Sequence, residues 1–494
     1  MAPTLAGWIG ETKEERVMTG NRTLRQLGGL AISIGLVVAA CGGTTASPSS
    51  RPTVVATTNP PVAATATPPA AATTTPSAAP AVSPSLATAS SPSASTGYTG
   101  PAATIEYAIW GDPTELKNQQ AIVDAFHAAE PKITVKVTVS DWTTYWDKLQ
   151  TGLAGGAAPD VFAMDGPLGP DYAGRDVLLD LTPYIQAENY PLSSLADLAV
   201  KDFTSPDGKQ FGLPRDQNVI ALFYNKKMFD AAKLPYPDDT WDWAKLVEVG
   251  KKLTIDTNSD GKPDQWGLYT ETTDMENYWS SLVWQNGGDI LAPDGKSTTL
   301  DTPAASGGLQ FLQDLIWKEK ITPDPALFAA TGDAFEQGKA AMEVNGSWLV
   351  ATDLAADLSF GIAPLPKGPA GRATSINPTG AVIYKNSKSP DAAWAFVKYL
   401  ASPAAQEMIM ALKASLPANK EVLAGPFATS FDGAGVLADA LTYAHLKPSF
   451  KGYNEFATAL QGELDPHVFN APDETAAAAI ENVKAQLNQI LAGQ

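Results

Sequence analysis

The chain has 494 residues, a formal net charge of −19 and a single cysteine. Five basic and three acidic residues precede position 101, so residues 101–494 carry a net charge of −21. A chain this acidic repels nucleic acid and anionic lipid surfaces, so we expect neither as a partner. With one cysteine the chain can form no internal disulfide, so a hydrophobic core must hold the fold together.

A short apolar run near the N-terminus has the features of a secretion signal. Arg22 and Arg25 precede the uncharged residues 26–40, the last of which are small. This run of 15 residues is shorter than the roughly 18–20 residues that a membrane-spanning helix needs. We therefore predict a signal peptide over residues 1–40, with Met18 as an alternative start.

The only cysteine, Cys41, directly follows the small residues of this run. The arrangement resembles the lipobox of bacterial lipoproteins, which implies cleavage before Cys41 and attachment of lipid to its thiol. The alternative is an uncleaved apolar anchor in which the cysteine is incidental.

Residues 41–100 have the composition of a disordered tether. From Gly42 to Gly100 the chain has no acidic residue, one basic residue and ten prolines among Ser, Thr and Ala. Such a segment cannot bury enough apolar surface to offset the entropy lost on ordering. As a flexible coil it spans on the order of 40 Å, which suits a domain held away from a membrane. The Ser, Thr and Pro content would also suit O-glycosylation.

The segment that follows predicts strands alternating with helices. Apolar and polar residues alternate in the first two strands, and the third is mostly apolar. Strands are expected at 104–109, 133–139 and 159–165, and helices between them over 116–129 and 143–153. This order favours parallel βαβ units and an α/β fold.

Later segments continue the mixed pattern without an internal sequence repeat. Further strands are expected at 219–224, 340–344, 360–364 and 381–383, and further helices over 242–254, 274–285, 303–318 and 473–491. Asp242 is a plausible N-cap of its helix.

Carboxylate and aromatic residues follow the expected strand ends. In open α/β sheets the ligand crevice lies beyond the carboxyl ends of the strands. The residues at these positions are Trp110, Asp112, Asp141, Trp142 and Asp165. Carboxylates bind sugar hydroxyls and aromatic faces cover C–H surfaces, so the combination indicates a sugar site. The alternatives are helix caps for the aspartates and core packing for the tryptophans.

Four stretches, taken in order, resemble one family. They are residues 155–166 (GGAAPDVFAMDG), 211–243, 335–348 (FEQGKAAMEVNGSW) and 360–400. They are similar to the family-1 extracellular solute-binding proteins, the maltose-binding-type sugar receptors of ABC importers, over about residues 103–490. The resemblance implies the type II periplasmic-binding-protein fold, in which two lobes close around a ligand by hinge bending. It also implies a monomer on the outer face of the membrane, with a sugar or oligosaccharide and an importer permease as partners.

The resemblance places three chain crossings between the lobes, near residues 214–217, 364–366 and 413–417, each of which contains a proline. A proline restricts φ, so it stiffens a hinge segment. The implied lobes are an N-lobe of residues 101–215 plus 366–413 and a C-lobe of residues 216–365 plus 414–494.

The resemblance also adds ligand-binding candidates. The family has an acidic residue at the position of Asp165 and a stacking aromatic residue at that of Trp348. Further candidates are Arg215, Asp216 and Gln217 at the first crossing, and Asn377 and Thr379 on the returning strand. Trp279 and Trp284 lie about 140° apart on one expected helix, so we expect one of them to face the cleft. Trp241, Trp266, Trp317 and Trp394 are assigned to the core or surface.

Residues 256–265 match the first part of an EF-hand calcium loop. The candidate Ca2+ ligands are Asp256, Asn258, Asp260, Lys262 through its carbonyl, Asp264 and Gln265. Position 12 is Gly267 and not the bidentate Glu, and some family members complete a similar loop with an acidic residue where Gln265 stands. The alternative is a polar hairpin with an Asx turn. No other cofactor is expected.

Three rival functions have weaker support in the sequence. A glycosidase needs a defined carboxylate pair, and the scattered His127, His445 and His467 match no metal-ligand spacing. A receptor for glycerol phosphate or another anion needs several cationic groups, whereas only Arg215 is expected near the cleft. An adhesive surface protein leaves the strand-end aromatic residues unexplained. We therefore expect a binding protein and not an enzyme.

Overall fold

The computed structural model describes residues 97–272, 278–328, 332–355, 358–413 and 415–493. The expected signal peptide, Cys41 and most of the expected tether lie outside the described residues. Among the residues that are described, no helix is long and apolar enough to cross a membrane.

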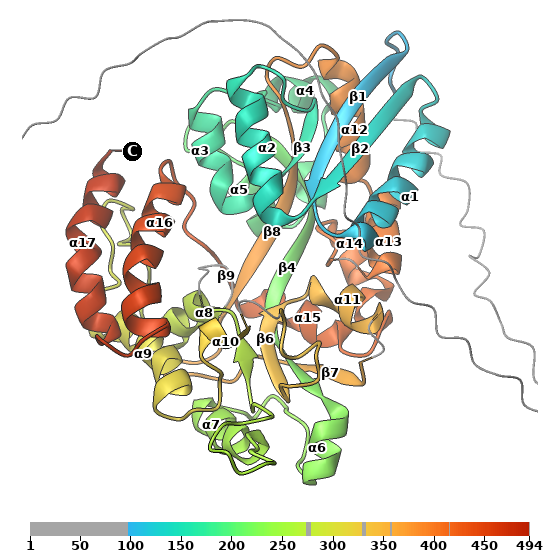
Figure 1. Ribbon diagram of the computed structural model, residues 1–494. Coiled ribbons are helices and arrows are strands. Elements are labelled where there is room, and N and C mark those ends of the chain that lie inside the picture. Colours follow the sequence, from blue (N-terminus) through green and yellow to red (C-terminus); the bar gives the residue numbers. More distant parts are fainter. Residues whose placement is uncertain (1–96, 273–277, 329–331, 356–357, 414, 494) are drawn as a thin grey trace, which may run out of the picture. The chain divides into compact units, whose positions relative to one another are not determined.

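The first described part of the chain forms parallel strands connected by helices. Strand β1 (Ala103–Trp110) pairs in parallel with β2 (Ile133–Ser140) and with β3 (Val161–Asp165). Helices α1 (Pro113–Ala129) and α2 (Trp142–Ala154) connect them. Alternate residues of β1 are fully or nearly fully buried, as the period-2 pattern predicts. The expected βαβ arrangement is confirmed for these three strands (Figure 1).

Two long strands run through both halves of the sheet. Strand β4 (Gly212–Asn225) and strand β8 (Thr374–Ile383) pair antiparallel, and all their residues are buried. At one end β8 pairs antiparallel with β3, and at the other β4 pairs antiparallel with β6 (Met342–Gly346) and β7 (Phe360–Ala363). Figure 1 shows β4 and β8 passing from the half that contains β1–β3 to the half that contains β6 and β7.

The sheet is therefore mixed, with the strand order β2-β1-β3-β8-β4-β6-β5. Strand β5 (Tyr269–Thr270) pairs in parallel with β6, and β9 (Ala444–Leu446) pairs in parallel with β8. The expectation of parallel βαβ units does not extend to β4, β6, β7 and β8, whose mutual pairings are antiparallel. Strands β4 and β8 are also longer than the expected strands at 219–224 and 381–383.

The remaining helices cover the two halves of the sheet. On the side of β1–β3 the structure has α3 (Gly169–Gly174), α4 (Thr182–Glu188), α5 (Asp197–Asp202), α12 (Pro390–Leu400), α13 (Pro403–Leu412) and α14 (Lys420–Ala424). The other half carries α6 (Lys226–Ala232), α7 (Trp243–Leu253), α8 (Tyr278–Gln285), α9 (Pro303–Trp317), α10 (Pro325–Phe328), α11 (Leu349–Ala355) and α15 (Ala434–Ala440). Asp242 caps α7 as expected, because its carboxylate accepts the amide hydrogen of Lys245.

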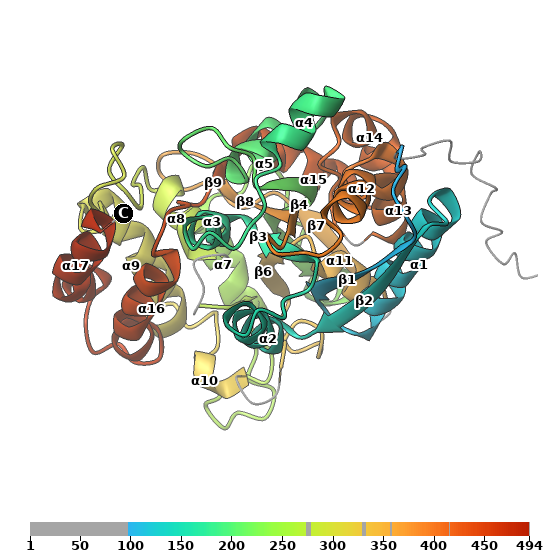
Figure 2. The ribbon, with the colours of Figure 1, turned by 90° about the horizontal axis from the view of Figure 1, so that it is seen from above.

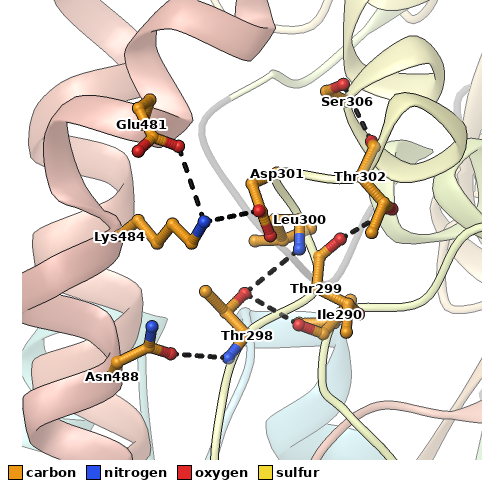
Figure 3. A network of polar contacts seen from close by, with 10 residues as sticks. All are labelled: Ile290, Thr298, Thr299, Leu300, Asp301, Thr302, Ser306, Glu481, Lys484 and Asn488. Carbon is orange, nitrogen blue, oxygen red and sulfur yellow. Dashed lines mark hydrogen bonds and ion pairs between the residues drawn. The ribbon is translucent and has the colours of Figure 1, made fainter. Parts of the chain in front are cut away.

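The two C-terminal helices, α16 (Tyr453–Leu464) and α17 (Ala476–Ala492), lie beside α9 in both views (Figures 1 and 2). Polar contacts fix α17 to the loop that precedes α9 (Figure 3). Lys484 forms an ion pair with Asp301 at 2.6 Å, and the side-chain oxygen of Asn488 accepts the amide hydrogen of Thr298 at 2.8 Å. The last helix is thereby joined to the half of the sheet that contains β6.

Three segments of the chain meet where β4 crosses between the halves. The register of β4 shifts between Pro214 and Asp216, and Gln217 exchanges backbone hydrogen bonds with Leu416. Strand β8 runs beside β4 at the same place. Lys367, expected in the N-lobe, exchanges backbone hydrogen bonds with Trp241 and Trp243 of the other half. The exact lobe boundaries stay a prediction.

Candidate functional site

A cavity of about 700 Å³ lies where the ends of β1, β2 and β3 approach the crossing of β4 and β8. Its lining residues include Trp110, Asp112, Asp141, Trp142 and Asp165 at the ends of β1–β3, Arg215, Asp216, Asn377 and Thr379 from β4 and β8, and Trp348 after β6. We call this cavity the cleft. The structure thus brings together residues that are far apart in the sequence.

Two cleft aspartates are also helix caps. One carboxylate oxygen of Asp112 accepts the amide hydrogen of Glu115 at 2.8 Å, and one oxygen of Asp141 accepts that of Thr144 at 3.0 Å. The hydrogen bonds from Thr144 lower the pKa of Asp141. Each carboxylate caps the first turn of a helix and also lines the cleft. Helix capping and a position in the candidate site are therefore compatible for these two residues.

An aromatic cluster forms one wall of the cleft. The Trp110 and Trp142 rings meet edge to face, with centroids 5.0 Å apart and an interplanar angle of 79°. Trp146 packs against Trp110 from α2, with centroids 5.8 Å apart. The Tyr145 hydroxyl donates a hydrogen bond to the Ala163 carbonyl of β3. Because the inner rings are packed, Trp142, which is 39% exposed, is held as an accessible apolar surface.

Trp348 reaches the cleft from the end of β6. The hydroxyl of the preceding Ser347 donates to the side-chain oxygen of Asn218 at 2.8 Å, and the Ser347 amide donates to the Val219 carbonyl at 2.9 Å. The indole lies over Gly346, where an added Cβ would come within 2.2 Å of the ring. A glycine at 346 therefore allows the half-buried indole to occupy this position.

A buried ion pair lies at the floor of the cleft. The guanidinium of Arg215 is 3.2 Å from the carboxylate of Asp216 and 4.0 Å from that of Glu115. Arg215 and Asp216 are 3% and 2% exposed. Burial raises the pKa of Asp216, and the charge of Arg215 opposes this. The positive charge of Arg215 is thus paired with carboxylates of the protein.

The side-chain amide of Asn377 is buried without a partner. Asn377 is 5% exposed, and neither its oxygen nor its nitrogen has a hydrogen-bond partner among the described residues. A buried amide usually satisfies both groups, because leaving either unpaired costs free energy. Its position in the cleft wall makes a polar ligand a natural partner.

The family model for bacterial extracellular solute-binding proteins matches residues 110–407. The chain belongs to this family. Its fold is the type II periplasmic-binding-protein fold, which confirms the expectation from the sequence.

Characterised relatives of this solute-binding protein cover most of its folded part. A galactooligosaccharide-binding protein of Bacillus subtilis is 25% identical, over 77% of this chain and 90% of its own. A maltotriose-binding protein of Pyrococcus abyssi is 26% identical, over 72% of this chain and 76% of its own. An ABC substrate-binding protein from Listeria monocytogenes, solved in complex with cycloalternan, is 28% identical with a TM-score of 0.72, covering 78% of this chain and 98% of its own.

Three expected ligand-binding residues of this solute-binding protein do not line the cleft. Gln217 is buried and donates from its side-chain amide to the Pro417 carbonyl at 2.8 Å. Trp279 is packed in the core, at 1% exposed. Trp284 stacks on His445, with centroids 4.9 Å apart, and its indole N–H donates to Asp289. The expectation that Trp279 or Trp284 faces the cleft is therefore not met by this arrangement.

The cleft also contains residues that the sequence analysis did not select: Glu115, Asn118, Asn218, Glu271, Asp333, Glu336, Asn345 and Ser415. Glu115 had a sequence signal, because it stands three residues after the cap Asp112, where a glutamate commonly supports the first helical turn. The loop residues Glu271, Asp333 and Glu336 have no such signal, because their approach to the cleft is decided by the tertiary fold.

In the candidate calcium loop the acidic side chains accept hydrogen bonds from the loop itself. The two oxygens of Asp256 accept the amide hydrogens of Ser259 at 2.7 Å and Gly261 at 2.9 Å. The Gln265 side chain donates to the Leu253 carbonyl at 2.7 Å. In the described part of the chain no three acidic, His or Cys side chains are grouped to hold a metal. The turns fit the Asx-turn alternative, and calcium binding stays a prediction.

Proposed function

We propose that this protein captures a sugar or oligosaccharide outside the cell and presents it to the permease of an ABC importer. The observation that carries the proposal is the composition of the cleft, which combines the indoles of Trp110, Trp142 and Trp348 with carboxylates and amides. A pyranose has apolar C–H faces and a rim of hydroxyls, so both kinds of side chain are needed to replace its water.

The arrangement of these groups supports the proposal further. Trp142 and Trp348 come from opposite halves of the sheet, so closure of the cleft would bring indole surfaces to a ligand from both sides. The unpartnered amide of Asn377 offers both N–H donors and an acceptor oxygen, which matches a sugar hydroxyl that both donates and accepts.

A receptor for glycerol phosphate or another anion is the runner-up, and the charge of the cleft disfavours it. Arg215 is the only cationic side chain among the described lining residues, and it is paired with Asp216. Recognition of a phosphate normally uses several cationic donors or helix N-termini.

The proposal includes a lipid anchor at Cys41 and binding without transformation of the ligand. The anchor rests on the small residues before the cysteine and on the tether composition. Cys41→Ser is expected to block lipid attachment and to move the protein from the membrane to the soluble fraction. An unchanged membrane fraction would contradict the anchor at Cys41. Absence of catalysis rests on the family and fold, which are those of binding proteins.

A thermal-shift screen against saccharides tests the binding proposal. A ligand present at about 100 times its dissociation constant stabilises the folded state by roughly 2.7 kcal/mol, so a true ligand raises the melting temperature. Amino acids, oligopeptides and glycerol phosphate serve as the comparison panel. A shift with one of these and none with any saccharide would contradict the proposal.

A further inference from the structure

The cleft is much more acidic than a neutral ligand requires. Its described lining contains one cationic side chain, Arg215, and eight carboxylates: Asp112, Glu115, Asp141, Asp165, Asp216, Glu271, Asp333 and Glu336. A water-excluding cleft lined by one sign of charge concentrates the field and favours a ligand of opposite charge.

The single cation does not balance these carboxylates. Arg215 is paired with Asp216 and lies near Glu115. Within the described residues, Asp112, Asp333 and Glu336 form no ion pair with a lysine or arginine. An unpaired carboxylate is tolerated in an open, wet cleft but becomes costly when closure removes water.

The unpaired carboxylates come from both halves of the molecule. Asp112 follows β1, whereas Asp333 and Glu336 lie in the loop before β6. They are close enough to interact, since after burial the charges of Asp333 and Asp112 raise the pKa of Glu336. Closing the halves therefore brings like charges together, and a neutral ligand would leave that repulsion in place.

More carboxylates lie behind Asp333 and Glu336, on the side away from the cleft. Glu343 of β6 and Asp353 of α11 are fully buried, and neither oxygen of Asp353 has a hydrogen-bond partner among the described residues. Burial, followed by the charge of Asp333, raises the pKa of Glu343 well above its ordinary value. Neither Glu343 nor Asp353 forms an ion pair with a lysine or arginine among the described residues.

We propose that the ligand is a saccharide bearing one or more amino groups, with an ammonium group held between Asp112 and the Asp333–Glu336 loop. This inference rests on the proposed function and names its substrate class. Such a ligand neutralises the charges that closure brings together and keeps the ring faces that the indoles cover. The unpartnered amide of Asn377, 95% buried in the same cleft, points independently to a polar ligand. Indole faces also attract cations, so the aromatic wall is compatible with an amino sugar.

Calorimetry with matched saccharides tests the proposal on the full-length protein. The β-linked pair is glucosamine trisaccharide and cellotriose, which differ only in the 2-amino group. The α-linked pair is kanamycin and maltotriose, which are similar in size but also differ in the central ring and in linkage. At about pH 7 solvent-exposed carboxylates are ionised and the amines keep much of their charge. We expect the amine-bearing member of at least one pair to bind at least about tenfold more tightly, a difference of roughly 1.4 kcal/mol. Added salt should reduce the difference.

Charge-neutral variants locate the effect. Asp333→Asn and Glu336→Gln should each lower the affinity ratio of the amine-bearing to the neutral saccharide by about threefold or more, since each removes one facing charge. Glu407→Gln removes the same charge from an exposed position on α13 outside the cleft and should leave the ratio unchanged. Neutral members that bind as tightly as their amine-bearing counterparts would overturn the charge inference and leave the sugar proposal standing. Failure of every saccharide in both pairs and in the thermal-shift panel would overturn both.

Discussion

Two acidic regions of the molecule differ in how their carboxylates are hydrogen-bonded. In the loop over residues 256–265, carboxylate oxygens accept hydrogen bonds from the loop's own backbone. Behind the cleft, the carboxylate of Asp353 accepts no hydrogen bond from the described residues. Both regions are acidic, but the sequence made only the loop a candidate for ligand binding. Asp256 is satisfied by two amide hydrogens and stays at the surface. Asp353 is fully buried, and its pKa is raised to about 7, mainly by burial.

The comparison shows why acidic composition alone does not define a site. A carboxylate with both oxygens hydrogen-bonded to the backbone of its own turn, as in Asp256, stabilises that turn and gains little from a ligand. A carboxylate enclosed beside like charges keeps an electrostatic cost that a cation or a proton relieves. The two cases differ in the hydrogen-bond partners and neighbouring charges of each carboxylate, which only the folded structure reveals.

The largest expected stability effect lies at the cleft floor. Asp216→Ala should lower the free energy of unfolding by about 3–5 kcal/mol, because it leaves the buried guanidinium of Arg215 with only the more distant Glu115. Urea unfolding measures the loss. Glu248→Gln, which breaks the exposed pairs with Lys245 and Lys252 on α7, should change stability by less than about 0.5 kcal/mol. Equal effects of the two substitutions would show that the cleft pair is not buried as described.

The carboxyl of Asp353 predicts a pH dependence of stability. Its pKa is raised from 3.8 to about 7, so the folded state binds this proton more tightly than the unfolded state. The group therefore favours the folded state below pH 4, and this contribution is lost as pH rises through about 7. Asp353→Asn should remove a dependence on the order of 2–4 kcal/mol between about pH 4 and pH 8, since one pKa unit is about 1.4 kcal/mol.

Unfolding at a series of pH values, with the difference taken between variant and wild type, measures that dependence. Asp124→Asn on the exposed face of α1 is the matched control and should follow the wild-type curve. A wild-type stability that increases with pH relative to Asp353→Asn over this window would contradict the raised pKa.

The calcium loop carries the smallest expected effect. If the loop binds Ca2+ at about ten times the dissociation constant, the ion stabilises the protein by roughly 1.4 kcal/mol, and a chelator should lower the melting temperature by a few degrees. Asp260→Ala should abolish the sensitivity to chelator and leave saccharide affinity nearly unchanged. A chelator effect that persists in Asp260→Ala would contradict calcium binding at this loop, and so would the lack of a chelator effect in wild type. Either result would favour the Asx-turn hairpin.

Periodicity alone predicted the β1–α1–β2–α2–β3 segment to within a few residues, because its core is built from regularly spaced apolar side chains. It predicted shorter strands for β4 and β8, because polar residues interrupt the apolar pattern. These are Arg215 to Asn218 in β4, and Thr374, Ser375, Asn377 and Thr379 in β8. The rule of strand carboxyl ends selected Trp110, Asp112 and Trp142, which the structure brings to the cleft. It could not select loop residues such as Asp333 and Glu336, and helical spacing could not show that α8 is buried on every side.

The central claim, a saccharide cleft closed by aromatic faces, is tested most directly at Trp348. In Trp348→Ala the ligand loses a stacking surface, which contributes roughly 0.5–1.5 kcal/mol beyond the area term of about 25 cal/mol per Å². We expect saccharide binding to weaken by about 2–4 kcal/mol, which is roughly 30- to 1000-fold.

Titration calorimetry of wild type and Trp348→Ala with the best saccharide, beside urea melts of both, is the decisive measurement. Trp317→Ala is the control, because Trp317 is also partly buried but its indole donates to the Phe469 carbonyl outside the cleft. Trp317→Ala should lower stability with an unchanged dissociation constant, whereas Trp348→Ala should lose more affinity than stability. An unchanged dissociation constant in Trp348→Ala, with a loss of several kcal/mol in folding as large-to-small core substitutions give, would assign Trp348 to the core and contradict the saccharide cleft.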